Sequence, residues 1–425
     1  MNVMNALKQT LFLLYITLGL AWSSQAASLL IPMDEKQTDH LKAYGIAYWT
    51  LQNGIEVDWL LNYRGGSFLL SYFKDIEKEC IIRNVSYEVI ADAQANRIVA
   101  EIAQEELNMD LVKLEKAPRI AVYSPKNLQP WDDAVTLTLS YAEIKYEVVY
   151  DEEVLRGDLS KYDWLHLHHE DFTGQYGKFY GAYRNMQWYK DDVAANEAMA
   201  AKLGFTKVSK LKLAVAKTIR EFVFNGGFLF AMCSAADSYD IALAAENTDI
   251  CEYMFDGDPA DPDAQSKLDF NNCLAFYNFE LVKDPMHYEY SNIDMTESRR
   301  VNQLEDYFTL FEFSAKWDPV PTMLCQNHTS MIHGFMGQTT AFNAETIKPH
   351  VLIMGQNKKA GEARYIHSEF GQGTWTFLGG HDPEDFQHRV GEEATVLAKY
   401  PNSPGYRLIL NNILFPAAKK KKLKT

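Results

Sequence analysis

Apolar residues along the chain alternate between short runs and helical patterns, which is typical of an α/β fold. The ranges where we expect strands are 28–32, 56–61, 86–91, 119–123, 146–150, 163–168, 228–232, 350–354 and 374–378. Helices are expected over 35–52, from after residue 91 to about 116, over 130–142 and over 205–225. Because helical patterns separate the strands, we expect βαβ units in a doubly wound, flavodoxin-like, mostly parallel sheet, with an additional smaller α/β unit at the N-terminus.

The pattern divides the chain into a leader, two folded parts and a tail. We expect a signal peptide over residues 1–26, an N-terminal α/β unit over 27–116 and a main domain over 117–418. Residues 241–349 of the main domain are aromatic, rich in Asp and irregular in pattern, and are expected to form an insertion. Residues 419–425 are a basic tail, which we interpret as solvated.

The N-terminus has the three parts of a secretory signal. Lys8 gives a positive start, residues 11–22 are apolar, and Ser24-Gln25-Ala26 supplies small residues for cleavage. Cleavage is expected after Ala26, with Ala27 as the alternative. No later apolar run is long enough to span a bilayer, so we expect an exported protein, periplasmic or secreted.

Composition narrows the classes of partner. Hydrophobic residues make up 47% of the 425 residues and aromatic residues 13%, so the chain can bury a substantial core. The formal net charge of -16 repels phosphate backbones, and nucleic acid is excluded as a partner. We expect a small-molecule, glycan or peptide substrate, and a protein partner remains an alternative.

One cysteine follows a buried strand directly. The run 219–237 reads as a helix end, Gly226-Gly227, an apolar strand, and then Cys233-Ser234 at the turn into the next helix. A helix N-terminus favours the thiolate, which is a competent nucleophile. The alternative is a buried cysteine that acts only as a small apolar side chain.

These segments resemble the class I glutamine amidotransferase-like superfamily. There, a Gly-Gly and a strand precede the nucleophilic cysteine, and a Gly-x-Gly strand precedes a catalytic His followed by Pro-Glu; this chain has Gly371-Gln-Gly and His381-Asp-Pro-Glu384. The resemblance implies Cys233 as nucleophile, His381 as general base and Glu384 as the residue that orients the imidazole. It also implies that backbone N–H groups near Ser234 hold the oxyanion.

The chain departs from the amidotransferase pattern at three places. Ala231 and Ala235 replace the two glycines that flank the family's cysteine. Asp382 stands between His381 and Pro-Glu, as in the trehalose-utilisation-type domains of the superfamily. The residues after strand 163–168 read His-Glu-Asp where the family has a glycine-rich oxyanion loop.

The whole mature chain is similar to exported bacterial proteins that are commonly labelled asparagine synthetase B. The motifs do not support that label. The family's enzymes need a cysteine directly after Met1, where this chain has Asn2, and a Ser-Gly-Gly-x-Asp-Ser loop for ATP, which this chain lacks.

Histidines follow the strand 163–168. His166 and His168 share one face of that strand, and His169-Glu170 begins the loop. Imidazoles are common ligands of zinc and other divalent ions, so His166, His168 and His169 could hold a metal. The missing ligand would be His287, His328, His333 or His381. The alternative is a polar rim that contains one core histidine, and His168, His169 and Glu170 then contact substrate.

Two further loops have candidate chemistry. Arg64-Gly65-Gly66 follows the expected parallel strand 56–61, and its backbone N–H groups and guanidinium could contact a ligand. The alternative is a tight turn. The acidic run Asp256–Asp263 resembles calcium loops only in its oxygen content, and we interpret it as a solvated turn.

Three functions follow from these residues. The first is a cysteine-dependent hydrolase that acts on an amide or a related acyl group, with no cofactor. The second is an amidotransferase-like domain without catalysis that binds a sugar or a protein in the cell envelope. The third is a metal-dependent hydrolase that uses the His168-His169 loop.

Overall fold

A computed structural model of the chain describes residues 27–125, 132–299, 301–302, 305–387, 389 and 392–418. The expected signal peptide (1–26) and basic tail (419–425) lie outside the described residues. Within these ranges, no helix combines the length and apolar character that crossing a membrane requires. The fold is mixed α/β, with one large mixed sheet and one smaller sheet.

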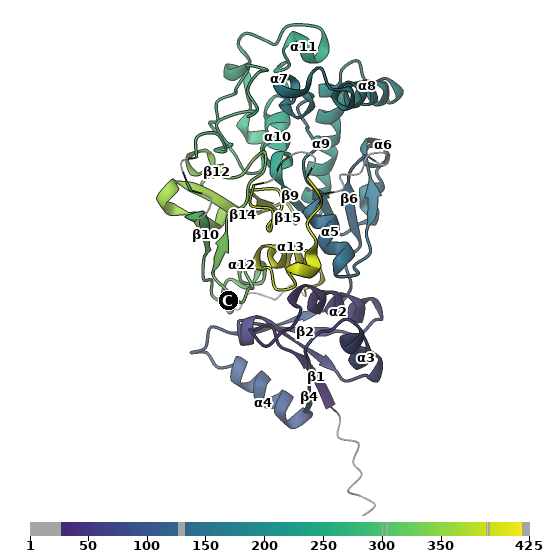
Figure 1. Cartoon of the computed structure of the whole chain (residues 1–425), viewed down its shortest axis with the longest axis vertical. Coiled ribbons are helices and arrows are strands. Elements are labelled where there is room, and N and C mark those ends of the chain that lie inside the picture. The colour runs from purple at the N-terminus through teal and green to yellow at the C-terminus, as the bar shows by residue number, and fades with distance from the viewer. Residues whose placement is uncertain are drawn as a thin grey trace, which may run out of the picture.

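The smaller sheet belongs to the N-terminal unit, drawn in purple and blue in Figure 1. Its strands are β1 (Ala27–Ile31), β2 (Val57–Leu61), β3 (Ser67–Ser71), β4 (Glu88–Ala91) and β5 (Asp110–Leu114). Its helices are α2 (His40–Gln52), α3 (Lys74–Ile82) and α4 (Asp92–Ile102). The strand order is β4-β1-β3-β2-β5, and all of these neighbours pair antiparallel.

The antiparallel pairing corrects the expectation of parallel βαβ units in this part of the chain. Only residues 62–66 join β2 to β3, and a parallel crossover needs a dozen or more residues. The helix expected to reach residue 116 ends at Ile102, and β5 follows it.

The large sheet has the strand order β11-β10-β13-β14-β15-β9-β8-β6-β7, with β12 paired to β14. Its strands are β6 (Ile120–Tyr123), β7 (Glu147–Val149), β8 (Trp164–Leu167), β9 (Phe228–Met232), β10 (Tyr307–Leu310), β11 (Met331–His333), β12 (Phe342–Asn343), β13 (Leu352–Asn357), β14 (Glu362–Phe370) and β15 (Gly373–Leu378). The neighbours from β15 to β7 pair in parallel, and those from β11 to β15 pair antiparallel. The sheet is therefore mixed rather than mostly parallel, and the insertion contributes β10, β11 and β12 to it.

Helices cover both faces of the parallel strands. The helices of this part are α5 (Ala134–Tyr141), α6 (Asp151–Leu155), α7 (Tyr180–Tyr183), α8 (Gln187–Lys202), α9 (Val208–Phe224), α10 (Cys233–Ala244), α11 (Tyr253–Asp256), α12 (Pro319–Leu324) and α13 (Pro404–Leu414). On β6, Ile120 and Val122 pack with α5 and α13, whereas Ala121 and Tyr123 pack with α9 and α10. This alternation is the period of two expected of a strand buried on both faces.

The two parts of the chain share one core. Figure 1 shows α2 of the N-terminal unit below α13 of the larger part, and residues of both helices belong to the same hydrophobic cluster. Arg407 of α13 is fully buried and donates to the Tyr44 hydroxyl (3.1 Å) and to the Met33 carbonyl (3.2 Å). The junction is therefore a packed interior rather than a linker.

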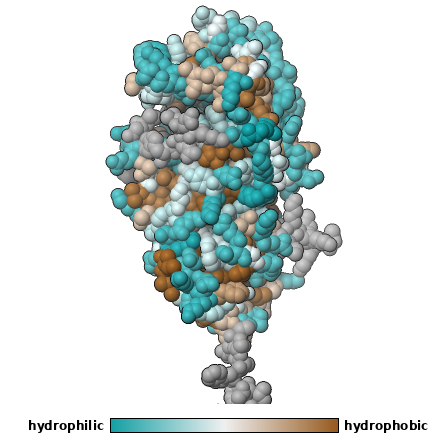
Figure 2. All heavy atoms as spheres, turned by 90° about the vertical axis from the view of Figure 1, so that its right-hand side faces the viewer, coloured by the Kyte–Doolittle hydropathy of each residue, from teal (hydrophilic) through white to brown (hydrophobic). Residues whose placement is uncertain are grey.

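The surface is mostly polar. Figure 2 shows hydrophilic side chains over most of one face, with apolar side chains in small separate patches. Ile81 and Ile82 of α3 are among the exposed apolar residues. Scattered apolar side chains of this kind are usual on soluble proteins and define no site.

Candidate functional site

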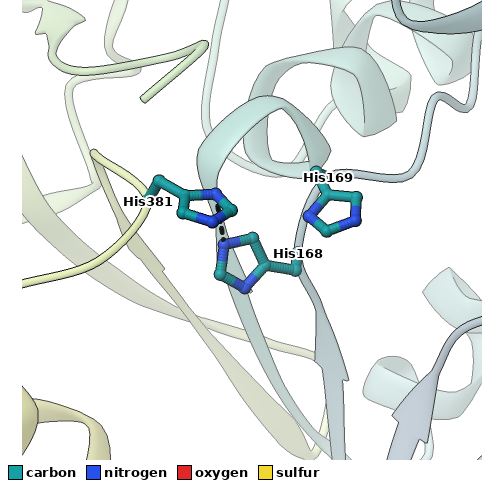
Figure 3. Close-up of side chains that lie close together, drawn as sticks. All are labelled: His168, His169 and His381. Atoms are coloured by element: carbon teal, nitrogen blue, oxygen red, sulfur yellow. Dashed lines mark hydrogen bonds between the residues drawn. The ribbon is translucent and has the colours of Figure 1, made fainter. Parts of the chain in front are cut away.

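Three histidines meet at the carboxyl ends of two parallel strands. His168 and His169 follow β8, and His381 follows β15; these two strands flank β9. Figure 3 shows the rings of His168 and His381 facing each other, joined by a hydrogen bond, with the His169 ring beside them. The carboxyl edge of parallel strands is where α/β folds place their ligands.

The ring nitrogens are close enough to share one ligand. His168 Nε2 and His381 Nδ1 lie 3.0 Å apart, and the two ring centroids are 4.5 Å apart. The His169 ring lies 5.1 Å from that of His168 and 5.8 Å from that of His381. One nitrogen from each ring lies within 4.8 Å of the other two.

Two carboxylates hold the far sides of these rings. His168 Nδ1 lies 3.3 Å from Asp133 Oδ2, and His381 Nε2 lies 3.5 Å from Asp132 Oδ2. Asp133 is fixed in place because its other oxygen accepts the backbone N–H of Thr136 at the start of α5 (2.8 Å). Carboxylates behind histidines in this way set the ring orientation at metal sites.

The pKa values in the cluster reflect the proximity of acids and bases. Burial would raise the pKa of Asp132, but the imidazoles, above all His381, hold it well below its usual value. The pKa of Asp133 is likewise lowered by His168 and His166 against the effect of burial. Burial, with the neighbouring imidazoles, lowers the pKa of His169 to about 3, so its ring is neutral at pH 7, which is the form that binds metals.

Glu170 lies at the base of the same loop. Its carboxylate accepts the backbone N–H of His168 (3.1 Å), and its backbone carbonyl accepts the Ser238 hydroxyl (3.2 Å). Burial raises the pKa of Glu170 to about 7. These contacts fix the loop that carries His168 and His169.

The structure divides the expected metal ligands between two groups: His168 and His169 lie with His381, and His166 and His168 lie with Asp133. His166 uses Nδ1 to donate to the Phe230 carbonyl (3.2 Å), and its Nε2 faces Asp133 (3.3 Å), so it is a core histidine held by fixed partners. His381 takes its place beside His168 and His169. The other candidate ligands lie elsewhere: His328 stacks on His40, His333 contacts the Phe386 ring at a tilt, and His287 faces Asp284.

The donor set suits a zinc-like ion. Two nitrogens bound to one tetrahedral Zn²⁺ at about 2.0–2.1 Å are about 3.3 Å apart, close to the separation of His168 Nε2 and His381 Nδ1. His169 adds a buried Nδ1 that has no hydrogen-bond partner among the described residues. Three imidazoles leave a fourth position for water or substrate.

A small cavity reaches the cluster from outside. Its lining includes Asp132, His381, Asp385 and Arg389, and the space within it holds about one water molecule. The lining is mostly acidic, with Arg389 as its cationic member.

The backbone of Cys233 lies beside that of His381, but the Cys233 side chain contacts other residues than the histidines do. It opens α10 with a φ of +50°, and its N–H donates to the Gly380 carbonyl (3.2 Å). Its sulfur accepts the backbone N–H of Gln338 (3.3 Å), and only 3% of the residue is exposed. Burial raises the pKa of the thiol to about 11, although backbone N–H groups of Gln338, Ser234 and Thr339 oppose that effect.

The strained φ is a feature of nucleophile turns, and Cys233 has it without flanking glycines. The Ser234 hydroxyl is buried without a partner among the described residues. Glu384 has the Ser403 hydroxyl as its side-chain partner, and its orientation of His381 stays a prediction.

Arg64, Gly65 and Gly66 do not converge on this site. Arg64 pairs with Asp34 (2.7 Å) and Glu88 (2.9 Å), both within the N-terminal unit. Both glycines have positive φ, and a Cβ on Gly65 would lie 2.3 Å from the Met33 carbonyl oxygen. The segment is a tight turn between antiparallel strands, which was the alternative to a ligand contact, and it does not end a parallel strand.

The acidic run Asp256–Asp263 is neutralised by lysines. Lys207 Nζ lies 2.7 Å from Asp249, 2.9 Å from Asp256 and 2.5 Å from Asp258, and Lys267 pairs with Asp261. An ammonium group occupies the place that a calcium ion would need. The five cysteines are all free.

Asp132, Asp133 and Gln338 are the site residues that the sequence did not identify. Asp132 and Asp133 follow β6 at the same edge of the sheet as His168, and this position after a parallel strand could have indicated that they belong to the site. Gln338 comes from the insertion, and no local pattern connects it with Cys233.

Comparisons with known proteins leave the family open. No family model and no curated protein matches the chain. Among solved structures, Cytoplasmic Protein STM3548 from Salmonella typhimurium is 11% identical (TM-score 0.33), and the match covers 71% of this chain and 100% of that one. Cytoplasmic Protein STM1381 from Salmonella typhimurium LT2 is 10% identical with the same coverages and a TM-score of 0.34. A beta-galactosidase from Bacillus circulans sp. alkalophilus is 10% identical (TM-score 0.25), and the match covers 61% of this chain and 28% of that one. Likenesses at this level support no conclusion about function.

Proposed function

We propose that this protein is a divalent-metal-dependent hydrolase whose ion is held by His168, His169 and His381. The observation that carries the proposal is the 3.0 Å separation of His168 Nε2 and His381 Nδ1, with the opposite ring nitrogens facing Asp133 and Asp132. A divalent ion with an open position lowers the pKa of bound water and polarises the bond to be cleaved.

The protein's own groups would divide the remaining work. Asp133 holds His168, and Asp132 holds His381, in the orientation that presents one nitrogen of each to the ion. The cavity beside Asp132 and His381 admits about one water molecule, and Arg389 at its lining could pair with an anionic part of the substrate. The proposed substrate is an amide or a related acyl compound that carries a polar group.

The fold proposed for this site follows from the strand order. The parallel strands β7-β6-β8-β9-β15, numbered by chain order, read 2-1-3-4-5, which is the flavodoxin-like order. This order supports our proposal that the chain belongs to the class I glutamine amidotransferase-like superfamily. We also propose that the protein is exported and that its signal peptide is cleaved near Ala26.

A cysteine-dependent hydrolase is the second candidate, because Cys233 has the φ of +50° that a nucleophile turn requires. The thiol's burial and its pKa of about 11 weigh against it. The catalytically inactive binding module remains the third candidate.

The test compares two variants on a panel of 4-nitrophenyl esters and 4-nitroanilides. Hydrolysis should disappear with 1,10-phenanthroline, return with Zn²⁺, be lost in His169→Ala and persist in Cys233→Ser. Loss in Cys233→Ser with no effect of the chelator would contradict the proposal in favour of the cysteine. Zn²⁺ binding without hydrolysis of any panel member would favour the binding module.

A further inference from the structure

A second cluster of metal-binding side chains lies in the insertion, apart from the three histidines. A backbone bridge pairs Leu281 with Ser291, so the segment between them forms a hairpin that carries His287 and Glu289. Glu297 follows in the next turn. One side-chain donor atom from each of His287, Glu289 and Glu297 lies within 4.8 Å of the other two.

Glu289 has an unusual environment for a carboxylate. Only 6% of the residue is exposed, and backbone N–H groups of Glu289 and Glu297 stabilise the carboxylate, but its Oε1 is buried without a hydrogen-bond partner among the described residues. Lys178 interacts with Glu289 electrostatically, but its ammonium group donates to the carbonyls of Val282 (2.7 Å) and Asp284 (3.1 Å). A buried carboxylate oxygen without a partner is costly and requires a compensating group.

We propose that His287, Glu289 and Glu297 form a second divalent-cation site. Two carboxylates and one imidazole would compensate the buried oxygen of Glu289 with the charge of the ion. One nitrogen and two oxygens suit Zn²⁺ or Mn²⁺, whereas Ca²⁺ takes six to eight oxygen ligands. The cluster uses no residue of the three-histidine centre, so this inference does not rest on the proposed function.

An ion at this cluster would join the hairpin to the turn that supports the neighbouring segment 336–340. The Thr296 hydroxyl, beside Glu297, donates to the Gln338 carbonyl (2.9 Å) and accepts the Thr340 N–H (3.0 Å). The carbonyl of Met336 accepts the N–H of His381 (2.8 Å). The second ion would therefore stabilise the part of the insertion that packs against the three-histidine centre.

The test counts bound Zn²⁺ per chain after desalting, by mass spectrometry of the metal. The wild type should bind two ions, His287→Ala/Glu297→Gln one, and His169→Ala/His381→Ala one. His350→Ala/Glu345→Gln removes an exposed histidine and an exposed glutamate outside both clusters and should still bind two. His287 and Glu297 are exposed, so their replacement leaves the core intact.

Each failure has a different result. If His287→Ala/Glu297→Gln binds as many ions as the wild type, the second site is wrong. If the wild type binds one ion that is lost in that variant alone, the three-histidine centre is wrong and the second site stands. Circular dichroism on every variant checks that the fold is retained.

Discussion

Cys233 and His381 are neighbours in the fold, yet their side chains have different partners. The Cys233 sulfur accepts the Gln338 N–H, whereas the His381 ring faces His168 and Asp132. At the scale of residues, the chemistry therefore depends on whether the three histidines or the Cys233 thiol carry out the reaction. The three-histidine set has supporting carboxylates, and the thiol has a raised pKa and little exposure.

The first prediction concerns the reactivity of Cys233. With a pKa of about 11, only about one thiol in ten thousand is a thiolate at pH 7. We expect iodoacetamide to leave Cys233 unmodified in the folded protein at pH 7, with a rate that rises as the pH increases toward 11. Peptide mapping measures the modification, and unfolded protein is the positive control. Rapid modification of Cys233 at pH 6 would contradict the assignment.

The residues of the site could be predicted in part. His168 and His169 were identifiable because they follow a buried strand, and His381 because it follows another. Their convergence depends on strand order, which local patterns do not encode. Asp132 and Asp133 could have been predicted in the same way, because they follow a strand at the same edge of the sheet. The contact of Gln338 with Cys233 depends on the path of a long insertion.

At the scale of elements, the apolar runs predicted the parallel strands β6, β7, β8, β9 and β15 of the large sheet well. Phe228–Met232 is a strand with the predicted bounds, and α9 follows the apolar positions at steps of three and four. The strands Ser67–Ser71, Asp110–Leu114 and Glu362–Phe370 are not among the expected strands, and β10 to β12 lie in a segment expected to be irregular. Short strands in polar surroundings have little periodicity, and pairing direction is set by connection length and tertiary packing.

The second prediction concerns a buried ion pair between Lys212 of α9 and Asp151 of α6. Lys212 Nζ lies 2.9 Å from Asp151 Oδ2 and donates to the hydroxyls of Tyr123 and Tyr150, both at 3.0 Å. We expect Lys212→Met to lower the free energy of unfolding by about 3–5 kcal/mol, because it leaves the Asp151 carboxylate buried and unpaired. Urea denaturation measures the change.

Lys210→Met on the exposed side of the same helix is the matched control and should change stability by less than about 0.5 kcal/mol. Equal stability of the two variants would mean that the Lys212–Asp151 pair contributes nothing to holding α9 in place.

At the scale of the whole molecule, the N-terminal unit is joined to the main part through buried polar groups. His40 of α2 stacks on His328 at 4.6 Å, and its Nδ1 lies 2.9 Å from Asn402 Oδ1. Burial, together with the charge of Arg407, lowers the pKa of His40 to about 4. Burial and the neighbouring His40 lower the pKa of His328 to about 3.

The third prediction is a loss of stability in acid. Between pH 6.5 and about 4, the unfolded state binds more protons at His40 than the folded state does, so acidification favours unfolding. The contribution is complete above pH 6.5 and falls by about 3 kcal/mol for His40 as the pH approaches 4. Chemical denaturation at several pH values measures it. The free energy of unfolding should depend less steeply on pH in His40→Asn than in the wild type, and equally steeply in His350→Ala. The same dependence in all three proteins would refute the assignment.

The most direct test of the metal centre is X-ray absorption at the zinc edge on protein loaded with one equivalent of Zn²⁺, in the His287→Ala/Glu297→Gln background. We predict nitrogen ligands at about 2.0–2.1 Å, with the multiple-scattering pattern of three imidazoles. The pattern should decrease to two imidazoles in His169→Ala. A spectrum dominated by oxygen or sulfur ligands, or one that His169→Ala leaves unchanged, would contradict a centre built from His168, His169 and His381.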